Sequence, residues 1–115
     1  NPDIVLVTNF TPVLPADIYA NKYNDWSHVK AVANKQVYKL PLGIYRSYTP
    51  SADTPMTLLW MAKTVYPKLF ADIDLTKEVK TYYEKLYGIR LTDAQVSDMF
   101  EPRANRADGF SQSGR

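Results

Sequence analysis

The sequence predicts an α/β fold in which helices cover both faces of a largely parallel β-sheet, in three α/β/α layers. The run DIVLV at residues 3–7 is apolar and β-branched, which is typical of a strand buried on both faces of a parallel sheet. A second candidate strand, QVYKL at residues 36–40, follows after an irregular stretch, and helical patterns occupy the rest of the chain.

Between the two candidate strands, the sequence favours loops and short helical turns. Two prolines lie in residues 8–15, and Pro15 is placed to start one or two helical turns over residues 16–20. Residues 24–32 indicate a loop with a short helical turn. Pro41 ends the second strand, because proline restricts the residue before it and donates no backbone hydrogen bond.

The first long helix is expected from about residue 52 to residue 66. Ser51 is placed as its N-cap, and Pro55 must lie in its first turn. Apolar side chains surround most of the helix, which predicts that it is mostly buried and that Trp60 belongs to the core. Pro67 ends it.

Two further helices carry clearer signals. Residues 76–87 place apolar side chains at helical spacing, and Gly88 supplies the C-terminal stop. The members of this stripe are Val79, Tyr82, Tyr83, Leu86 and Tyr87. The last helix is expected to start at Thr92, which forms a capping box with Gln95.

One domain is expected over residues 1–101, followed by a disordered tail over residues 102–115, which contain almost no apolar side chains. Two strands are too few for a stable sheet. Either the chain forms a homodimer through its exposed sheet edges, or further strands lie N-terminal to Asn1.

The composition excludes several classes of function. Fourteen basic and twelve acidic residues give a net charge of +2, which is too balanced to indicate a nucleic-acid-binding protein. There is no cysteine, and no apolar run of about 18 residues that could span a membrane. The N-terminus lacks the charged and apolar regions of a signal peptide.

Enzymatic motifs are also missing from the sequence. His28 is the single histidine, so no histidine pair exists to bind a metal. Asp72 and Asp74 are interpreted as solvated charges at the start of a helix. No phosphate loop, dinucleotide fingerprint or nucleophile elbow is present, so we expect no enzyme, no resident metal and no cofactor.

The candidate binding residues follow the ends of the two strands. Ligands of α/β sheets bind at the carboxyl ends of strands, where residues 8–11 and the loop after the second strand lie. The second loop contains Tyr45, Arg46 and Tyr48, which could clamp an anionic, partly aromatic ligand. The alternative is that Arg46 pairs with Asp53 while the tyrosines cover the end of the sheet.

Four segments in a fixed order carry a family resemblance: NPDIVLV, WSHVKAVANKQVYKLP, TPSADTPMTLLWMAKTVYPKLF and YYEKLYGIRLTDAQV. Together they resemble the C-terminal lobe of periplasmic substrate-binding proteins of the ferric-siderophore, haem and vitamin B12 class. The resemblance implies two α/β lobes joined by a long helix, with a ligand held between them and delivered to an ABC permease. This chain would be one lobe of such a two-lobed binding protein, without the first strand and helix of that lobe.

The resemblance also implies roles for individual residues on the loops that face the ligand. The residues expected to contact it are Arg46 and Tyr45, with Tyr48 on the same loop and Asn9 and Phe10 on the other. The family frequently has a tryptophan in the first of these loops, where this chain has Tyr-Arg-Ser-Tyr. This departure leaves the identity of the ligand open.

Asp53 matches an acidic position at which the family often has a surface carboxylate that docks on arginines of the permease. Its alternative role is stabilisation of the helix start, worth about 0.3–1 kcal/mol. The docking role requires that this carboxylate be exposed.

The function expected from the resemblance is the capture of a ferric siderophore or related metal chelate for an ABC importer. The expected partners are the chelate and the permease subunits, and the expected location is the periplasm or the cell surface, with an anchor. The alternative is a ligand-sensing or protein-interaction domain that reuses the same lobe without a role in transport.

Overall fold

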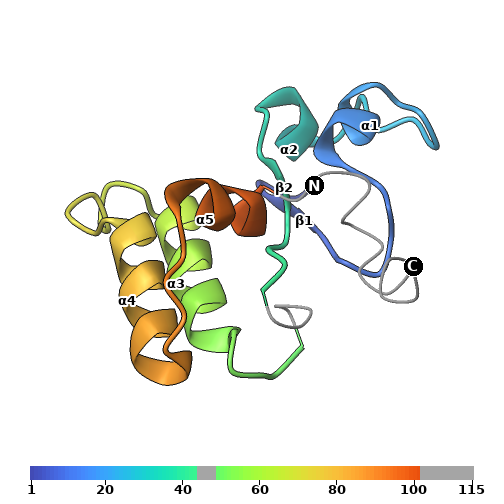
Figure 1. The fold of residues 1–115 in the computed structure, drawn as a ribbon. Coiled ribbons are helices and arrows are strands. Elements are labelled where there is room, and N and C mark those ends of the chain that lie inside the picture. The colour runs from blue at the N-terminus through green and yellow to red at the C-terminus, as the bar shows by residue number, and fades with distance from the viewer. Residues whose placement is uncertain (44–48, 102–115) are drawn as a thin grey trace, which may run out of the picture.

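The computed structural model describes residues 1–43 and 49–101, which contain two strands and five helices (Figure 1). The N-terminal half contains β1 (Val5–Val7), α1 (Pro15–Tyr19), α2 (Lys30–Ala33) and β2 (Val37–Lys39). The C-terminal half contains α3 (Thr54–Val65), α4 (Leu75–Tyr87) and α5 (Asp93–Phe100). The predicted order of strands and helices is therefore confirmed.

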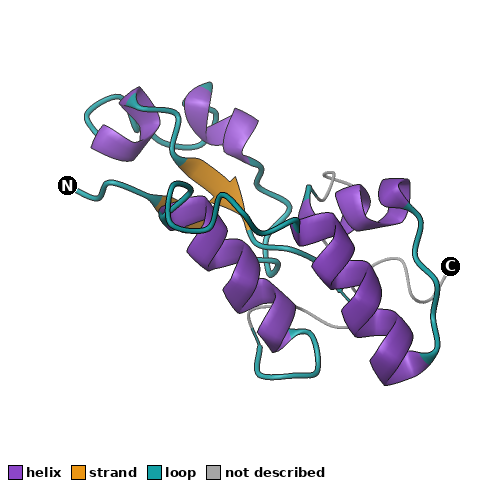
Figure 2. Cartoon of the chain, turned by 90° about the vertical axis from the view of Figure 1, so that its left-hand side faces the viewer, coloured by secondary structure: helices purple, strands orange, loops and turns teal. Residues whose placement is uncertain are grey.

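The two strands form a parallel pair in which Val5 lies opposite Val37 and Val7 lies opposite Lys39. Side chains alternate across the sheet, so Val7 and Val37 share one face. They pack there against Ile18 of α1 and Val32 of α2. The parallel sheet is thus present, with α1 and α2 over one face (Figure 2).

Helix α3 covers the opposite face of the sheet through Trp60. The rings of Tyr38 and Trp60 meet edge to face, with centroids 6.4 Å apart and planes at 84°. Trp60 is only 8% exposed, which confirms its predicted place in the core. The sheet therefore lies between α1 and α2 on one side and α3 on the other, as the three-layer prediction required.

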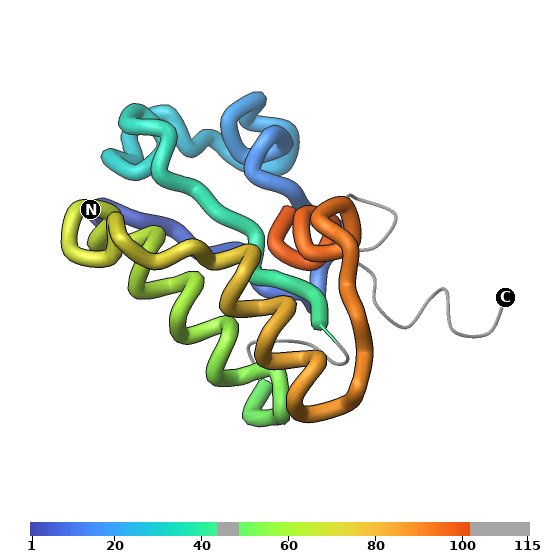
Figure 3. Tube along the Cα trace, turned by 60° about the vertical axis from the view of Figure 1, so that its left-hand side comes forward, coloured from blue at the N-terminus to red at the C-terminus, as the bar shows by residue number. Residues whose placement is uncertain are grey.

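Helices α3 and α4 run antiparallel side by side, and α5 crosses near them (Figure 3). A second core lies among these helices, built on Val79, Tyr83 and Val96. The remaining members of the predicted α4 stripe are less buried, and Leu86 is 52% exposed. Packing within the described residues therefore uses only one side of that stripe.

The predicted helix ends in the C-terminal half are largely confirmed. The Asp74 carboxylate accepts a hydrogen bond from the Lys77 amide and caps α4, whose C-terminal stop is Gly88 at φ 66°. The side chains of Thr92 and Gln95 form the capping box of α5. Each of these helix caps is formed by residues close together in the chain, so the sequence pattern predicts it well.

Two predictions about α3 are wrong. Its N-cap position is occupied by Asp53 and not by Ser51, whose hydroxyl instead accepts a hydrogen bond from the Asp53 amide 3.2 Å away. The helix is also not mostly buried within these residues, because Leu58 is 58% exposed and Val65 is 36% exposed. None of the described helices is long and apolar enough to cross a membrane.

Candidate functional site

The carboxyl ends of β1 and β2 lie next to each other, as the predicted binding site requires. The Leu40 amide donates a hydrogen bond to the Val7 carbonyl at 2.9 Å, which extends the parallel ladder beyond β2. Two residues after β1, the Asn9 side-chain amide donates to the Leu40 carbonyl at 2.6 Å. The loops that leave the two strands are thereby joined at their bases.

Asn9 is fully buried, with an exposed fraction of 0%. Its side-chain amide holds the two loops together in this conformation, and its predicted contact with a ligand stays a prediction. Phe10, the next residue, is 58% exposed at the same end of the sheet. Its predicted contact with a ligand stays a prediction.

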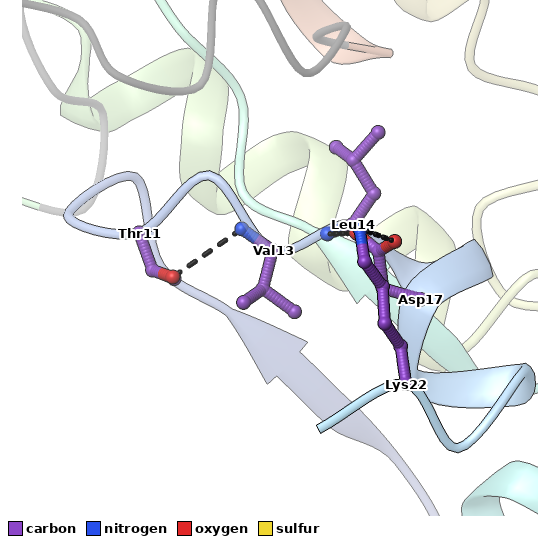
Figure 4. Close-up of polar contacts among 5 residues, drawn as sticks. All are labelled: Thr11, Val13, Leu14, Asp17 and Lys22. Atoms are coloured by element: carbon purple, nitrogen blue, oxygen red, sulfur yellow. Dashed lines mark hydrogen bonds and ion pairs between the residues drawn. The ribbon is translucent and has the colours of Figure 1, made fainter.

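The loop after β1 is braced by a buried lysine. The Lys39 ammonium donates hydrogen bonds to the carbonyls of Thr11 and Val13, at 2.5 and 2.8 Å. The Val13 amide donates to the Thr11 hydroxyl at 3.3 Å (Figure 4). Lys39 is only 5% exposed, and these loop carbonyls help to stabilise its buried charge.

The same loop runs directly into α1, whose first turn is capped by Asp17 (Figure 4). The Leu14 amide donates to the Asp17 carboxylate at 2.9 Å, and the Lys22 ammonium lies 3.1 Å from the other carboxylate oxygen. The hydrogen bond from Leu14, followed by that from Lys22, holds the pKa of Asp17 below its ordinary value. This cap fixes where the loop ends.

The loop after β2 begins at a tightly packed glycine. The Leu42 amide donates to the Met99 carbonyl of α5 at 2.8 Å, which anchors this end of the loop. A Cβ atom on Gly43 would lie 2.4 Å from the Asp53 carboxyl carbon, so only glycine fits beside that carboxylate. Residues 44–48, which include Tyr45, Arg46 and Tyr48, lie outside the described residues.

The structure places Asp53 in a buried hydrogen-bonded pair. This residue is only 2% exposed, and its carboxylate accepts a hydrogen bond from the Tyr83 hydroxyl. Next to it, the Tyr82 hydroxyl donates to the Ala52 carbonyl at 2.5 Å. In this conformation Asp53 is an internal acceptor that joins α4 to the start of α3, and its predicted docking on permease arginines stays a prediction.

The environment of this pair changes the acidity of the phenol. Burial raises the pKa of Tyr83 above its ordinary value, and the hydrogen bond to the negatively charged Asp53 raises this pKa further. Tyr83 therefore stays protonated at neutral pH and acts as a hydrogen-bond donor.

A cavity of about 610 Å³ lies elsewhere, along β2 and between the helices. Its lining includes Tyr38, Lys39, Trp60, Val96 and Phe100, but not Asn9, Phe10 or Asp53. Among the described residues, no cluster of three or more histidine or acidic side chains could hold a metal ion. At the ends of the strands, the described residues offer hydrogen-bond donors and acceptors and the exposed ring of Phe10.

Sequence reasoning missed the buried roles of Lys39 and Tyr83. A signal for Lys39 was present, because it shares the inward face of β2 with Val37 in the alternating pattern QVYKL. A signal for Tyr83 was its central place in the α4 stripe, where a buried hydroxyl needs a partner. The identity of that partner was not visible in the pattern.

The fold is shared with a class of transport proteins. The chain superposes on the crystal structure of a periplasmic solute-binding protein from Veillonella parvula with a TM-score of 0.81 and 34% sequence identity, over 96% of this chain. It has the fold of one part of such a protein, since the match covers 33% of the other chain. No family model matches the sequence.

The chain is also similar in sequence to the molybdate-binding protein MolA of Haemophilus influenzae. The two sequences are 33% identical over an alignment of 95 residues, and the match covers 76% of this chain and 24% of MolA. The chain thus spans about a quarter of the length of this relative. Both similar proteins are named as binding proteins.

Proposed function

We propose that this chain is part of the substrate-binding component of an ABC importer and that it contributes one wall of the site for an anionic ligand. The observation that carries the proposal is the meeting of the two strand-end loops in a fold shared with a periplasmic solute-binding protein. Ligands of parallel α/β sheets bind at this end of the strands.

The favoured ligand is an oxyanion of the molybdate type. Similarity to the molybdate-binding protein of Haemophilus influenzae supports an oxyanion ligand. The ferric siderophore expected from the sequence resemblance has no such support. Both ligands present anionic oxygen atoms, and an arginine can pair bidentately with either. Arg46 is therefore proposed to counter the ligand charge in both cases.

The neighbouring residues are given different parts in the proposal. Tyr45, Tyr48 and the exposed Phe10 would provide flat contact surface around the ligand, and the two tyrosines would also provide hydroxyl donors. Asn9 would support the site by keeping the two loops together through its hydrogen bond to Leu40. The permease is the proposed partner, with Asp53 as the proposed docking residue, which would have to become exposed from its buried position. The proposed location is the periplasm or the cell surface.

The test uses the complete protein that contains these 115 residues. Isothermal titration is performed with molybdate, with sulfate and with a ferric hydroxamate chelate. We expect molybdate to bind, and Arg46→Ala to weaken it by at least about 30-fold, equivalent to about 2 kcal/mol. Binding of the ferric chelate alone would favour the siderophore class, and binding of none of the three would refute the proposal.

A matched control is offered by Arg90, whose side chain is 86% exposed and pairs with Glu84 at 3.2 Å. Arg90→Ala removes the same charge from an exposed surface position, so we expect molybdate affinity to remain within about twofold. Equal losses in both variants would mean that overall charge, and not Arg46, attracts the ligand.

A further inference from the structure

The cavity along β2 lies between the two cores of the molecule. The core on the α1 and α2 side of the sheet includes Val37, and the core among the C-terminal helices includes Val96. Both residues line the cavity, together with residues of α1, α3 and α4. Its volume of about 610 Å³ falls within the range of about 300–1,000 Å³ that is typical of small-molecule sites. The space is therefore large enough for a small organic compound.

The buried part of the cavity wall is apolar and aromatic. Trp60 and Val37 line it and are almost completely buried. Tyr38, whose ring meets that of Trp60 edge to face, lines it as well. Phe100 of α5 and Leu75 of α4 are half-buried members of the same lining. Flat and apolar side chains of this kind favour a ligand with an apolar ring.

The polar part of the lining lies closer to solvent. Ser97 and Glu101 are exposed, and Thr64 adds a half-buried hydroxyl group. Two charged residues belong to the lining, and the ammonium of one of them, Lys39, binds the loop carbonyls described above. The other, Glu101, forms no ion pair with any residue that the structure describes. An exposed carboxylate beside an apolar cavity favours a positively charged group on the ligand.

We propose that this cavity binds a small amphipathic amine, with its apolar ring against Trp60 and its ammonium group paired with Glu101. The buried wall selects the ring and the exposed carboxylate selects the charge, so an anionic compound of the same size binds less well. The cavity is separate from the site at the strand ends, because its lining contains neither Asn9 nor Phe10. The proposal therefore does not depend on the transported ligand.

An NMR titration of the complete protein with phenethylamine tests the site, with the indole N–H signal of Trp60 as the reporter. We expect this signal to shift with a Kd on the order of 1 mM, as is typical of so small a compound. Hydrocinnamate, which has a similar size and the opposite charge, should bind at least about threefold more weakly. No shift of Trp60 at about 10 mM phenethylamine would overturn the proposal, because another part of the protein would then fill the cavity. Equal or stronger binding of hydrocinnamate would overturn the proposed ligand class.

Two variants locate the bound compound within the molecule. Glu101→Gln removes the charge from an exposed residue, and we expect it to weaken phenethylamine binding by about threefold and to abolish the preference over hydrocinnamate. Ser97→Phe adds a ring to the lining and should weaken both compounds by about 10-fold or more. Its matched control is Ala94→Phe, at an exposed position of α5 outside the lining, which should bind both compounds as the wild type does. A preference that survives in Glu101→Gln would refute the role of this carboxylate, and equal affinities in Ser97→Phe and Ala94→Phe would refute the location.

Discussion

The Tyr83 hydroxyl donates a hydrogen bond to the Asp53 carboxylate, thirty residues earlier in the chain, and both residues are only 2% exposed. The bond joins the middle of α4 to the residue that precedes α3. The same carboxylate packs against Gly43. Asp53 therefore brings together the residues before and after the segment that carries the proposed ligand residues.

We expect Tyr83→Phe to lower the free energy of unfolding by about 1–3 kcal/mol, because a buried carboxylate loses a hydrogen-bond donor. Urea denaturation of the purified protein measures this change. Tyr66→Phe, at a residue that is 58% exposed, is the control and should stay within about 0.5 kcal/mol of the wild type. Equal stability of the two variants would show that the buried bond contributes nothing net.

The raised pKa of Tyr83 predicts a loss of stability in alkaline solution. Because the folded state holds the phenol proton more tightly than the unfolded state, the stabilisation is complete below the ordinary tyrosine pKa of about 10 and falls as the pH rises above it. We therefore expect the stability difference between wild type and Tyr83→Phe to shrink between about pH 9 and about pH 11. Denaturation midpoints across this range provide the measurement, and a constant difference would contradict the prediction.

Gly43→Ala is expected to destabilise the protein by about 1–3 kcal/mol, since the added methyl group overlaps the Asp53 carboxylate. A double-mutant cycle with Asp53→Ala supplies the control. The methyl group should be far better tolerated once the carboxylate is gone, so the two effects should not add. Simple additivity would mean that Gly43 is required for another reason.

Lys39→Met keeps the apolar stem of the side chain but removes the ammonium that binds the Thr11 and Val13 carbonyls. We expect faster amide exchange in residues 11–14 and a loss of about 1–3 kcal/mol in unfolding free energy. Lys68→Met, at an exposed lysine, is the matched control. Unchanged exchange in the loop would show that Lys39 does not brace it.

Local features of the fold were predictable. The stop at Gly88 and the capping box of Thr92 and Gln95 involve residues no more than five apart, so they are visible as short patterns. The buried position of Trp60 followed from the apolar character of the helix that carries it. Exposure of Leu58 could not be predicted from that helix, because it depends on which elements are present to cover it.

The location of the candidate site was predictable from the sequence, but the burial of its residues was not. The rule that ligands bind at the carboxyl ends of parallel strands correctly brought the loops after β1 and β2 together. The burial of Asn9 and Asp53 was not foreseen, because the same polar residue suits a loop surface or an internal hydrogen bond equally well. Only the neighbours supplied by packing decide between these two environments.

The sequence by itself determined the α/β class, the order of the elements and the ends of the last two helices, since these depend on periodicity and on contacts between near neighbours. The tertiary structure decided that Asp53 is an internal partner of Tyr83, that Lys39 binds loop carbonyls, and that Tyr19 closes one edge of the sheet. Each of these contacts joins groups 18 to 30 residues apart. A buried charge or edge is defined by what packs against it, which no local pattern encodes.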